Sequence, residues 1–503
     1  MEFGQNILDK IDSLIKSSLS SLGNSCISFD EIAIVVEVNS SIIVAKGFTK
    51  ISYEECVVID DRYVGVVSII ANDIVKIILL NRTNDIKAGS RVKRTGRPLS
   101  ISVGDSLVGR VLDGLGRPVD NLGEIATTKN LPIERPATTI MDRKSVGEPL
   151  QTGIKTIDSL IPIGKGQREL ILGDRQTGKT TITLDTILNQ KDQDVLCVYC
   201  GIGQRDSSLT NIVKILRDHG AMKYTIVVQS GSSEIVGQQF MAPYTATTIA
   251  EYFMEQGKHV LVIYDDLTKH ARVHREISLL LEKNPGREAY PADIFYAHAR
   301  LLERSANRKR EAGGGSLTAL PIVETESGNI SAYIPTNIIS ITDGQIYLSP
   351  TLFQSGILPA IDVGKSVSRI GGAAQTIAYR DTVKTLGMDY SQFEELESFS
   401  KFSMNLDEST EKIIVKGKQI REILKQKIHS PLSMAEQVGI FLCLNSGALS
   451  KIPPEKMEET QKIIVEVVNE NLEKINAAIK SGKIIDQNLL DSFLAKVKSR
   501  LGE

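Results

Sequence analysis

One eight-residue segment constrains this chain more than any other part of its sequence. It matches the pattern G-x-x-x-x-G-K-[ST] in full and reads Gly173, Asp174, Arg175, Gln176, Thr177, Gly178, Lys179, Thr180. An apolar stretch precedes it and a helical pattern follows. Glycines let backbone N–H groups turn inward around an anion, and the helix N-terminus adds partial positive charge. Lys179 would reach the β- and γ-phosphates of a nucleotide and the Thr180 hydroxyl would ligate Mg²⁺, so the segment predicts a nucleotide-binding α/β domain.

A second apolar stretch, Val260–Tyr264, runs into Asp265 and Asp266. An acidic residue at the end of a buried strand can orient Mg²⁺ through its water shell. Because the phosphate-binding pattern is also present, we favour Asp265 as the magnesium partner over a carboxylate in a solvated turn.

Gln204 closely follows the apolar stretch Val195–Cys200. A hydrolytic site needs a group here that orients and polarises the attacking water, often a Glu. A carboxamide can hold that water but cannot take its proton. Some GTPases use Gln for positioning, so this residue argues against hydrolysis without excluding it.

Arg369 lies in the Gly- and Ser-rich segment 364–372. An arginine in such a loop can act as an arginine finger on a phosphate. Local sequence alone favours a surface arginine, so both interpretations stay open at this point.

Three further patterns predict structure rather than chemistry. Cys197 and Cys200 have C-x-x-C spacing on an expected strand, where they point to opposite faces, so zinc or redox use is not expected. His270 and His274 lie four apart on an expected helix, and we place both on its surface. The basic run 304–310 is interpreted as a solvated helix end.

The hydrophobic pattern divides the chain into four parts. Residues 1–26 have the apolar stripe of an amphipathic helix, and a stripe of this kind can dock on a partner. Residues 27–96 contain five or six short β-branched runs between turn residues, which predicts a small β-barrel or sandwich. Residues 97–374 start with a Gly- and Pro-rich passage and then alternate strand and helix, which predicts a mostly parallel sheet. Residues 375–503 are helical in pattern.

Two details of the α/β part can be checked directly. We expect a strand at Ile338–Ile341, because this run is continuously apolar. We also expect Gly220 and Gly257 just past the ends of two helices, where a left-handed backbone is needed.

Composition excludes several classes of function. The 503 residues include 59 Lys and Arg against 61 Asp and Glu, a formal net charge of −2, which argues against a general nucleic-acid coat. Five scattered cysteines indicate a reducing compartment. No apolar run approaches a membrane span, and the N-terminal residues resemble neither a signal peptide nor a mitochondrial transit peptide.

Six segments together resemble the alpha subunit of rotary F-type ATP synthases. The similarity runs in order from about residue 28 to the C-terminus. The segments are Gly173–Thr180, Ile263–Lys269, Pro285–Ala306, Gly313–Thr325, Tyr333–Leu348 and Val367–Thr376. The resemblance implies a multidomain α/β protein with an N-terminal β-barrel, a central P-loop (RecA-like) nucleotide-binding domain and a C-terminal helical domain.

The resemblance also implies a function and a set of partners. Three such chains would alternate with three homologous beta subunits around a central-stalk gamma subunit, and a membrane proton channel would drive ATP synthesis. This chain would bind Mg-ATP at a non-catalytic site, with Gln204 where beta carries Glu, and would lend Arg369 to its neighbour. Ser366 would lie in the same activity-sensitive loop. The leading helix would dock the peripheral-stalk delta subunit.

The same resemblance places the nucleotide base near Phe353, Pro359 and Gln426. Two positions depart from the family pattern: Leu358 stands where an Arg is usual, and Ile428 where a second Gln is frequent. Both changes remove polar groups from the expected base pocket. The expected location is the cytoplasmic face of a bacterial inner membrane, with an organellar membrane as the alternative.

Three alternative functions fit these residues less well. A self-sufficient hexameric ATPase of the secretion or flagellar-export type would need its own catalytic Glu, which Gln204 argues against. An RNA-translocating helicase of the Rho kind would need a basic N-terminal domain with exposed aromatics, and residues 28–92 have no basic stripe. Because that stripe is missing and the net charge is near zero, we expect no nucleic-acid partner. A structural protein without nucleotide is disfavoured by the intact phosphate-binding pattern.

Overall fold

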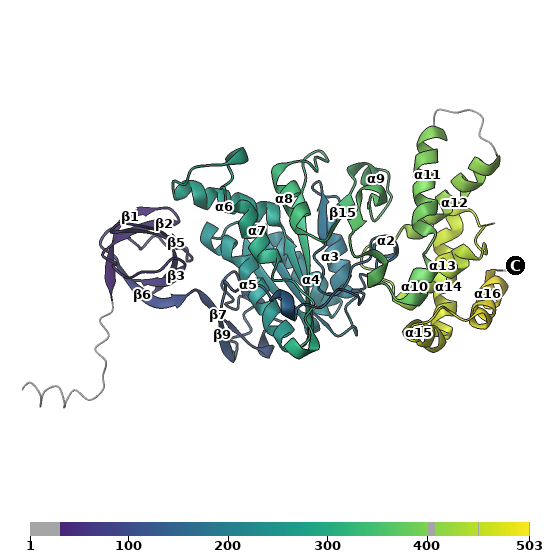
Figure 1. The fold of residues 1–503 in the computed structure, drawn as a ribbon, viewed down its shortest axis with the longest axis horizontal. Coiled ribbons are helices and arrows are strands. Elements are labelled where there is room, and N and C mark those ends of the chain that lie inside the picture. The colour runs from purple at the N-terminus through teal and green to yellow at the C-terminus, as the bar shows by residue number, and fades with distance from the viewer. Residues whose placement is uncertain (1–30, 401–407, 451, 502–503) are drawn as a thin grey trace, which may run out of the picture.

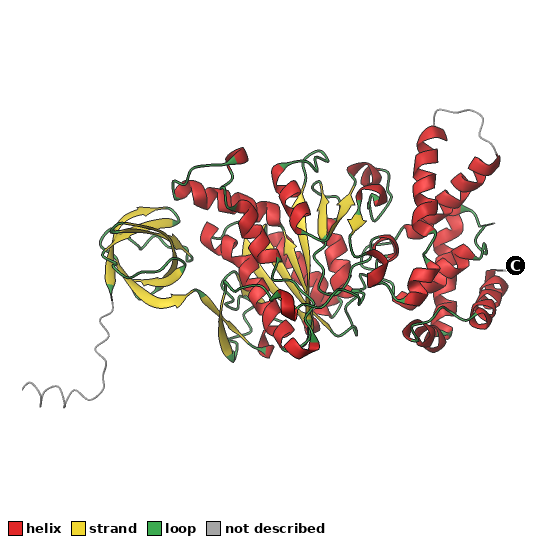
Figure 2. Cartoon of the chain, viewed as in Figure 1, coloured by secondary structure: helices red, strands yellow, loops and turns green. Residues whose placement is uncertain are grey.

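The computed structural model describes residues 31–400, 408–450 and 452–501. These residues form three bodies in a row: a β-barrel, a central α/β domain and a helical domain (Figures 1 and 2). This arrangement confirms the fold class expected from the sequence. The amphipathic helix expected in residues 1–26 lies outside the described residues.

The first body is a closed antiparallel barrel with the strand order β1-β2-β5-β4-β3-β6. Alternate β-branched residues fill its interior, as the period-two pattern predicts. Its strands are β1 (Ile32–Asn39), β2 (Ile42–Lys46), β3 (Glu55–Ile59), β4 (Tyr63–Ala71), β5 (Ile74–Leu79) and β6 (Arg91–Pro98).

The Gly- and Pro-rich passage after the barrel folds onto the central domain, as expected, and adds strands of its own. β7 (Ser100–Val103) and β9 (Lys129–Pro132) pair with each other, while β8 (Val111–Asp113) joins the edge of the central sheet beside β12. Short 3₁₀ turns η1 (Asp105–Leu107) and η2 (Ile140–Asp142) lie within it.

The central sheet has eight strands in the order β16-β15-β10-β14-β13-β11-β12-β8. All neighbours are parallel except the β15–β16 pair, which confirms the predicted parallel sheet. The remaining strands are β10 (Leu170–Gly173), β11 (Val195–Gln204), β12 (Thr225–Gly231), β13 (His259–Asp265), β14 (Ser316–Glu324), β15 (Gly344–Leu348) and β16 (Val367–Ser368).

Helices cover both faces of this sheet, so its strands are apolar on both sides. In β10, Leu170 and Leu172 belong to one hydrophobic cluster and Ile171 to the other. α2 (Lys155–Leu160), α3 (Lys179–Leu188) and α4 (Asp206–Asp218) pack in the second cluster. The first cluster holds α5 (Val236–Glu255), α6 (Leu267–Leu280), α7 (Ile294–Leu302) and α8 (Tyr333–Ile341). Shorter elements are η3 (Ala221–Tyr224), η4 (Arg287–Ala289), η5 (Arg310–Ala312), α9 (Pro350–Gln354), η6 (Val363–Lys365) and η7 (Gly371–Ala374).

The expected strand at Ile338–Ile341 is wrong, because these residues end helix α8. Ile334, Ile338 and Ile341 are buried at helical spacing, and a four-residue apolar run cannot distinguish a strand from a buried helix. The strand of this region is β15, which follows directly. Gly220 and Gly257 do follow helix ends, with φ of 71° and 84°.

The third body contains helices only among its described residues. They are α10 (Ile377–Thr382), α11 (Leu386–Ser400), α12 (Glu408–Leu424), α13 (Met434–Asn445), η8 (Pro454–Lys456), α14 (Met457–Glu470), α15 (Leu472–Lys480) and α16 (Gln487–Leu501). Ser433 and Glu436 form a capping box that starts α13. In the part of the chain that the structure describes, no helix is long and apolar enough to cross a membrane.

Candidate nucleotide-binding site

The phosphate-binding loop joins β10 to α3 in the strand–loop–helix order that the sequence predicts. Gly178 begins the helix with a left-handed φ of 96°. Gly173 is required for a different reason, since a Cβ there would lie 2.8 Å from the Leu348 carbonyl oxygen and 2.9 Å from Thr177 Oγ1. The two glycines therefore allow the tight turn and its close packing against β15.

Lys179 is buried inside this loop, with 7% of its surface exposed. Its Nζ donates to the carbonyl oxygens of Gly173 at 2.8 Å and Asp174 at 2.5 Å. Burial lowers the pKa of this amine, while nearby carboxylates such as Glu324 and Asp266 act in the opposite direction. The ammonium is thus held by the loop's own carbonyls at the position where phosphate oxygens would bind.

Asp265, at the end of β13, accepts hydrogen bonds from three side chains on two other elements, α3 and β11. Its Oδ2 accepts hydrogen bonds from Thr180 Oγ1 and from the Tyr199 hydroxyl, both at 2.7 Å. Its Oδ1 accepts a bond of 2.7 Å from Gln204 Nε2. The structure therefore brings Thr180, Asp265 and Gln204 into contact. Tyr199 was missed, because a buried tyrosine within a strand carries no sequence signal of its own.

The other polar residues of the loop bind their own chain. Asp174 Oδ1 accepts bonds from the Thr325 hydroxyl at 2.6 Å and the Gly328 amide at 2.9 Å. Thr177 Oγ1 donates to the Asp174 carbonyl, and Arg175, largely exposed, contacts Glu324 at 3.2 Å. Asp174 therefore holds the loop against the segment after β14. Gln176 is exposed and has a left-handed φ of 61°.

A cavity of about 80 Å³ lies beside the start of α3. Phe353, Pro359 and Gln426, the three expected base-pocket residues, all line it together with Leu358 and Ile428. The Leu358–Pro359 peptide bond is cis. Asp185 lines the same cavity and was not expected from the sequence; it accepts hydrogen bonds from the backbone and ring of His429.

Ser366 and Arg369 lie at the β16 edge of the sheet, two strands away from β10. Ser366 Oγ donates to the Asp362 carbonyl at 2.6 Å and accepts from the Tyr347 amide at 2.9 Å. The Arg369 amide donates to the Asp343 carbonyl at 2.9 Å, and its exposed guanidinium makes no hydrogen bond or ion pair with the described residues. The loop backbone is therefore fixed while the arginine head is left open to solvent.

The expectation that His270 and His274 lie on a helix surface is wrong. His270 is fully buried and His274 is 8% exposed, because α6 is packed against α5. His270 Nε2 faces the Phe240 carbonyl at 3.1 Å and therefore carries the proton, so its Nδ1 accepts from His298 Nε2 at 3.2 Å. Burial lowers the pKa of His270 to about 3 and the pKa of His298 well below its ordinary value, so these two buried rings are neutral and structural.

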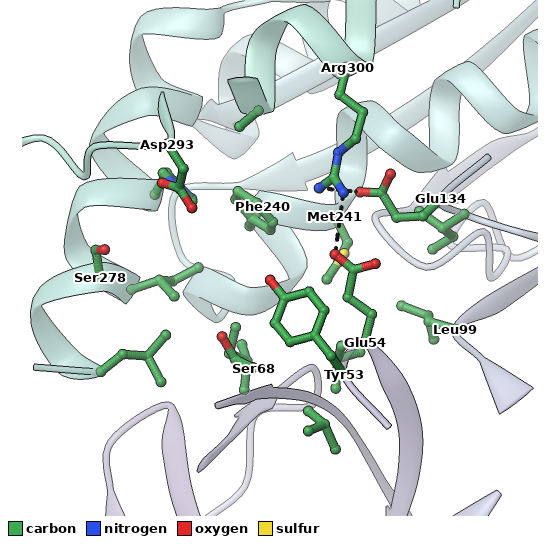
Figure 3. Close-up of a pocket in the computed structure, with 18 of the residues that line it drawn as sticks. Tyr53, Glu54, Ser68, Leu99, Glu134, Phe240, Met241, Ser278, Asp293 and Arg300 are labelled. Atoms are coloured by element: carbon green, nitrogen blue, oxygen red, sulfur yellow. Dashed lines mark hydrogen bonds and ion pairs between the residues drawn. The ribbon is translucent and has the colours of Figure 1, made fainter. Parts of the chain in front are cut away.

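A cavity of about 340 Å³ separates the barrel from this histidine cluster. Figure 3 shows Arg300 reaching between Glu54 of the barrel side and Glu134, at 3.4 and 2.9 Å. The Tyr53 ring points into the same space, opposite Phe240. The Arg300–Glu54 ion pair joins the barrel side to the central domain, so we assign the cavity to their junction and not to the nucleotide site.

The expected solvated run 304–310 is partly wrong. Arg304 is fully buried, and its guanidinium makes a bidentate ion pair with Glu251 at 2.6 and 2.8 Å. Lys309 and Arg310 are exposed, as expected. Cys197 and Cys200 belong to clusters on opposite faces of the sheet, which confirms that they do not form a paired site.

Comparison with known proteins identifies the family to which the chain is similar. Residues 153–368 match the nucleotide-binding domain of the ATP synthase alpha/beta family, and residues 375–499 match the C-terminal domain of ATP synthase alpha/beta chains. The chain is 54% identical to ATP synthase subunit alpha 2 of Syntrophus aciditrophicus over 92% of this chain and 89% of that protein. It is 51% identical to subunit alpha 1 of a Marinomonas species over 90% of each. It is 48% identical to subunit alpha 2 of Syntrophotalea carbinolica, over 97% and 94%.

Proposed function

The chain belongs to the ATP synthase alpha/beta family and falls among its alpha subunits, and from this premise we propose that it binds Mg-ATP without hydrolysing it and regulates catalysis on a neighbouring beta subunit. The observation that carries the proposal is the contact between Gln204 and Asp265. The side chain of β11 that contacts the Asp265 carboxylate is the amide of Gln204, and an amide cannot take a proton from water.

The residues of the loop suit a triphosphate. The backbone N–H groups at the start of α3 and the Lys179 ammonium supply the positive charge. Lys179 already holds carbonyl oxygens at 2.5 and 2.8 Å, so phosphate oxygens would replace these partners without moving the helix.

The Thr180 hydroxyl and the Asp265 carboxylate fit Mg²⁺, because this ion prefers oxygen ligands and keeps several waters. Thr180 would bind the ion directly and Asp265 through water. Bound Mg²⁺ would neutralise phosphate charge. The chain's own part is to orient the Asp265 carboxylate. Tyr199 does this by a hydrogen bond to Oδ2 and Gln204 by a hydrogen bond to Oδ1.

The nucleotide test uses the purified full chain. We expect Mg-ATP binding by titration calorimetry, loss of binding in Lys179→Ala, and negligible phosphate release. Gln204→Glu is a matched variant that restores a proton acceptor. Turnover by the wild-type chain that Lys179→Ala abolishes would refute the non-catalytic assignment.

Arg369 is proposed as the finger that this chain gives to its neighbour, supported by its open guanidinium on a fixed backbone. Ser366, hydrogen-bonded to Asp362 and Tyr347, would hold the loop in shape. In the assembled complex, we expect Arg369→Ala to leave ATP binding by this chain intact and to reduce turnover by about 10³-fold or more. Failure of Arg369→Ala to assemble, with Arg369→Lys assembling normally, would make the residue structural.

Assembly and location follow from the same family assignment. We propose an alternating hexamer with three beta subunits around a gamma subunit, coupled to a membrane proton channel, with the delta subunit bound by residues 1–26. The complex would lie on the cytoplasmic face of a bacterial inner membrane. Native co-purification tests this: an equal number of homologous chains carrying Glu at the Gln204 position is expected, and a complex built only from this chain would contradict it.

A further inference from the structure

Gln167 is a fully buried amide in the turn that leads into β10, and each of its hydrogen-bonding groups has a partner. Its Oε1 accepts the Gly164 amide at 2.7 Å. Its Nε2 donates to Glu169 Oε2 at 2.7 Å and to Ser368 Oγ at 3.2 Å, so both N–H donors are used. The Gly164 amide is a donor and requires the side-chain oxygen on its side, which leaves the nitrogen facing Ser368.

Ser368 directly precedes Arg369, and its hydroxyl holds the loop of this arginine together. Its Oγ donates to the Pro162 carbonyl at 2.7 Å and accepts from the Gly371 amide at 3.3 Å, so it closes a turn around Arg369. The bond from Gln167 is the third to the same oxygen. A hydroxyl has one donor and two lone pairs, and these three bonds use all of them. The orientation of the Ser368 side chain is therefore set by the turn before β10.

The backbone contacts of this loop are few. β16 has two residues, and its pairing with β15 places Ser368 opposite Gly344. The Arg369 amide donates to the Asp343 carbonyl at 2.9 Å. A Cβ at position 344 would lie 2.5 Å from Glu169 Oε2, so the glycine lets this edge of the sheet lie directly against the buried carboxyl group. Because so short a strand offers few ladder bonds, the side-chain bonds to Ser368 are a large part of what fixes the loop.

We infer that Gln167 is a positioning residue for Arg369 and acts through Ser368. The inference rests on the proposed role of Arg369 as an arginine finger. The Arg369 guanidinium is exposed and makes no hydrogen bond or ion pair with the described residues, so within them its backbone sets where it can reach. A misplacement of about 1 Å can cost about 10²-fold in rate. Gln167 is fully buried, so it affects catalysis only through the groups that it contacts.

The experiment measures ATP turnover of the assembled complex with variants at both ends of the Gln167–Ser368 bond. Gln167→Met removes both donors and keeps an unbranched side chain, and Ser368→Ala removes the hydroxyl. Gln487→Met and Ser481→Ala make the same changes at exposed positions of the helical domain. We expect Gln167→Met and Ser368→Ala each to lower kcat by about tenfold or more with little change in KM, and both controls to match the wild type.

A second measurement separates positioning from a general effect on the fold. Phosphate release in a single turnover is followed in the Arg369→Ala complex, with and without Gln167→Met or Ser368→Ala. A residue that acts by placing the guanidinium has no further effect once that group is gone, so we expect rates within about twofold of Arg369→Ala alone. A further loss by the same factor as in the wild-type background would mean that Gln167 supports the fold as a whole, and the inference would be wrong.

The inference and the proposed finger fail differently. If Arg369→Ala itself leaves turnover unchanged, the finger role is refuted, and the inference with it. If Arg369→Ala lowers turnover while Gln167→Met or Ser368→Ala keeps the wild-type rate, only the inference is lost. If Gln167→Met does not assemble, the two measurements on Ser368→Ala decide, because that variant removes the same bond from its partly exposed end.

Discussion

Lys155 lies where α2 meets the helical domain, and its amine is withdrawn from water beside neutral partners. It is 2% exposed, and its Nζ donates to the Lys425 carbonyl at 2.9 Å and to Gln461 Oε1 at 2.5 Å. Desolvation lowers the pKa of this amine from 10.5 to about 7. Opening the junction would return it to water and to its ordinary pKa.

The sign and size of the resulting pH dependence follow from linkage. Between pH 7 and about 10.4 the opened state binds about one proton more than the closed state, so the free energy of opening rises with pH. The slope approaches about 1.3 kcal/mol per pH unit. From pH 7.5 to pH 9.5 the junction should therefore gain about 2.5 kcal/mol.

The assay is hydrogen exchange of the full chain in urea, read by mass spectrometry on peptides covering 153–161 and 419–432 at several pH values. A local measurement is needed because a chain of several bodies does not unfold in two states. Lys155→Met removes the amine and keeps an unbranched side chain, and Lys418→Met makes the same change at an exposed site on α12.

We expect the difference between wild type and Lys155→Met to change by about 2.5 kcal/mol over this pH range, while Lys418→Met follows the wild type. Differences between variants cancel the titration of all other groups. Parallel profiles for wild type and Lys155→Met would refute the reasoning, since the amine would then be solvated or paired with an acid.

Three further outcomes follow from buried contacts. Arg304→Met should cost about 3–5 kcal/mol in urea unfolding of the central domain, and Arg304→Met with Glu251→Gln should cost less than the sum of the single changes. Gly237→Ala should cost about 1–3 kcal/mol in thermal denaturation, because the new Cβ would lie 2.2 Å from a β5 carbonyl oxygen; Gly387→Ala, whose nearest neighbour would be a side chain at 3.6 Å, should not destabilise. Burial raises the pKa of Glu169, so stability should fall as pH rises above about 4.5, and Glu169→Gln should flatten that fall; an unchanged profile would contradict it.

Features that depend on residues close together in the chain could be predicted from the sequence. The phosphate-binding loop needs glycine, lysine and threonine at fixed spacing, and that spacing predicted the strand–loop–helix order that β10 and α3 show. Alternating β-branched residues predicted the barrel, because a half-buried strand has period two. The spacing of apolar residues distinguishes a strand from a helix poorly where the run is short, which is why Ile338–Ile341 was wrongly assigned to a strand.

Burial and convergence were decided only by the tertiary structure. Asp265 contacts Thr180, Tyr199 and Gln204 because β11 pairs in parallel with β13 and the loop after β10 lies at the same edge of the sheet, a relation between residues up to 85 positions apart. Helix packing, not helical spacing, buried His270 and Arg304. A side chain's type states which bonds it can make, whereas the partners and the water left around it depend on what the fold places beside it, as at Gln167.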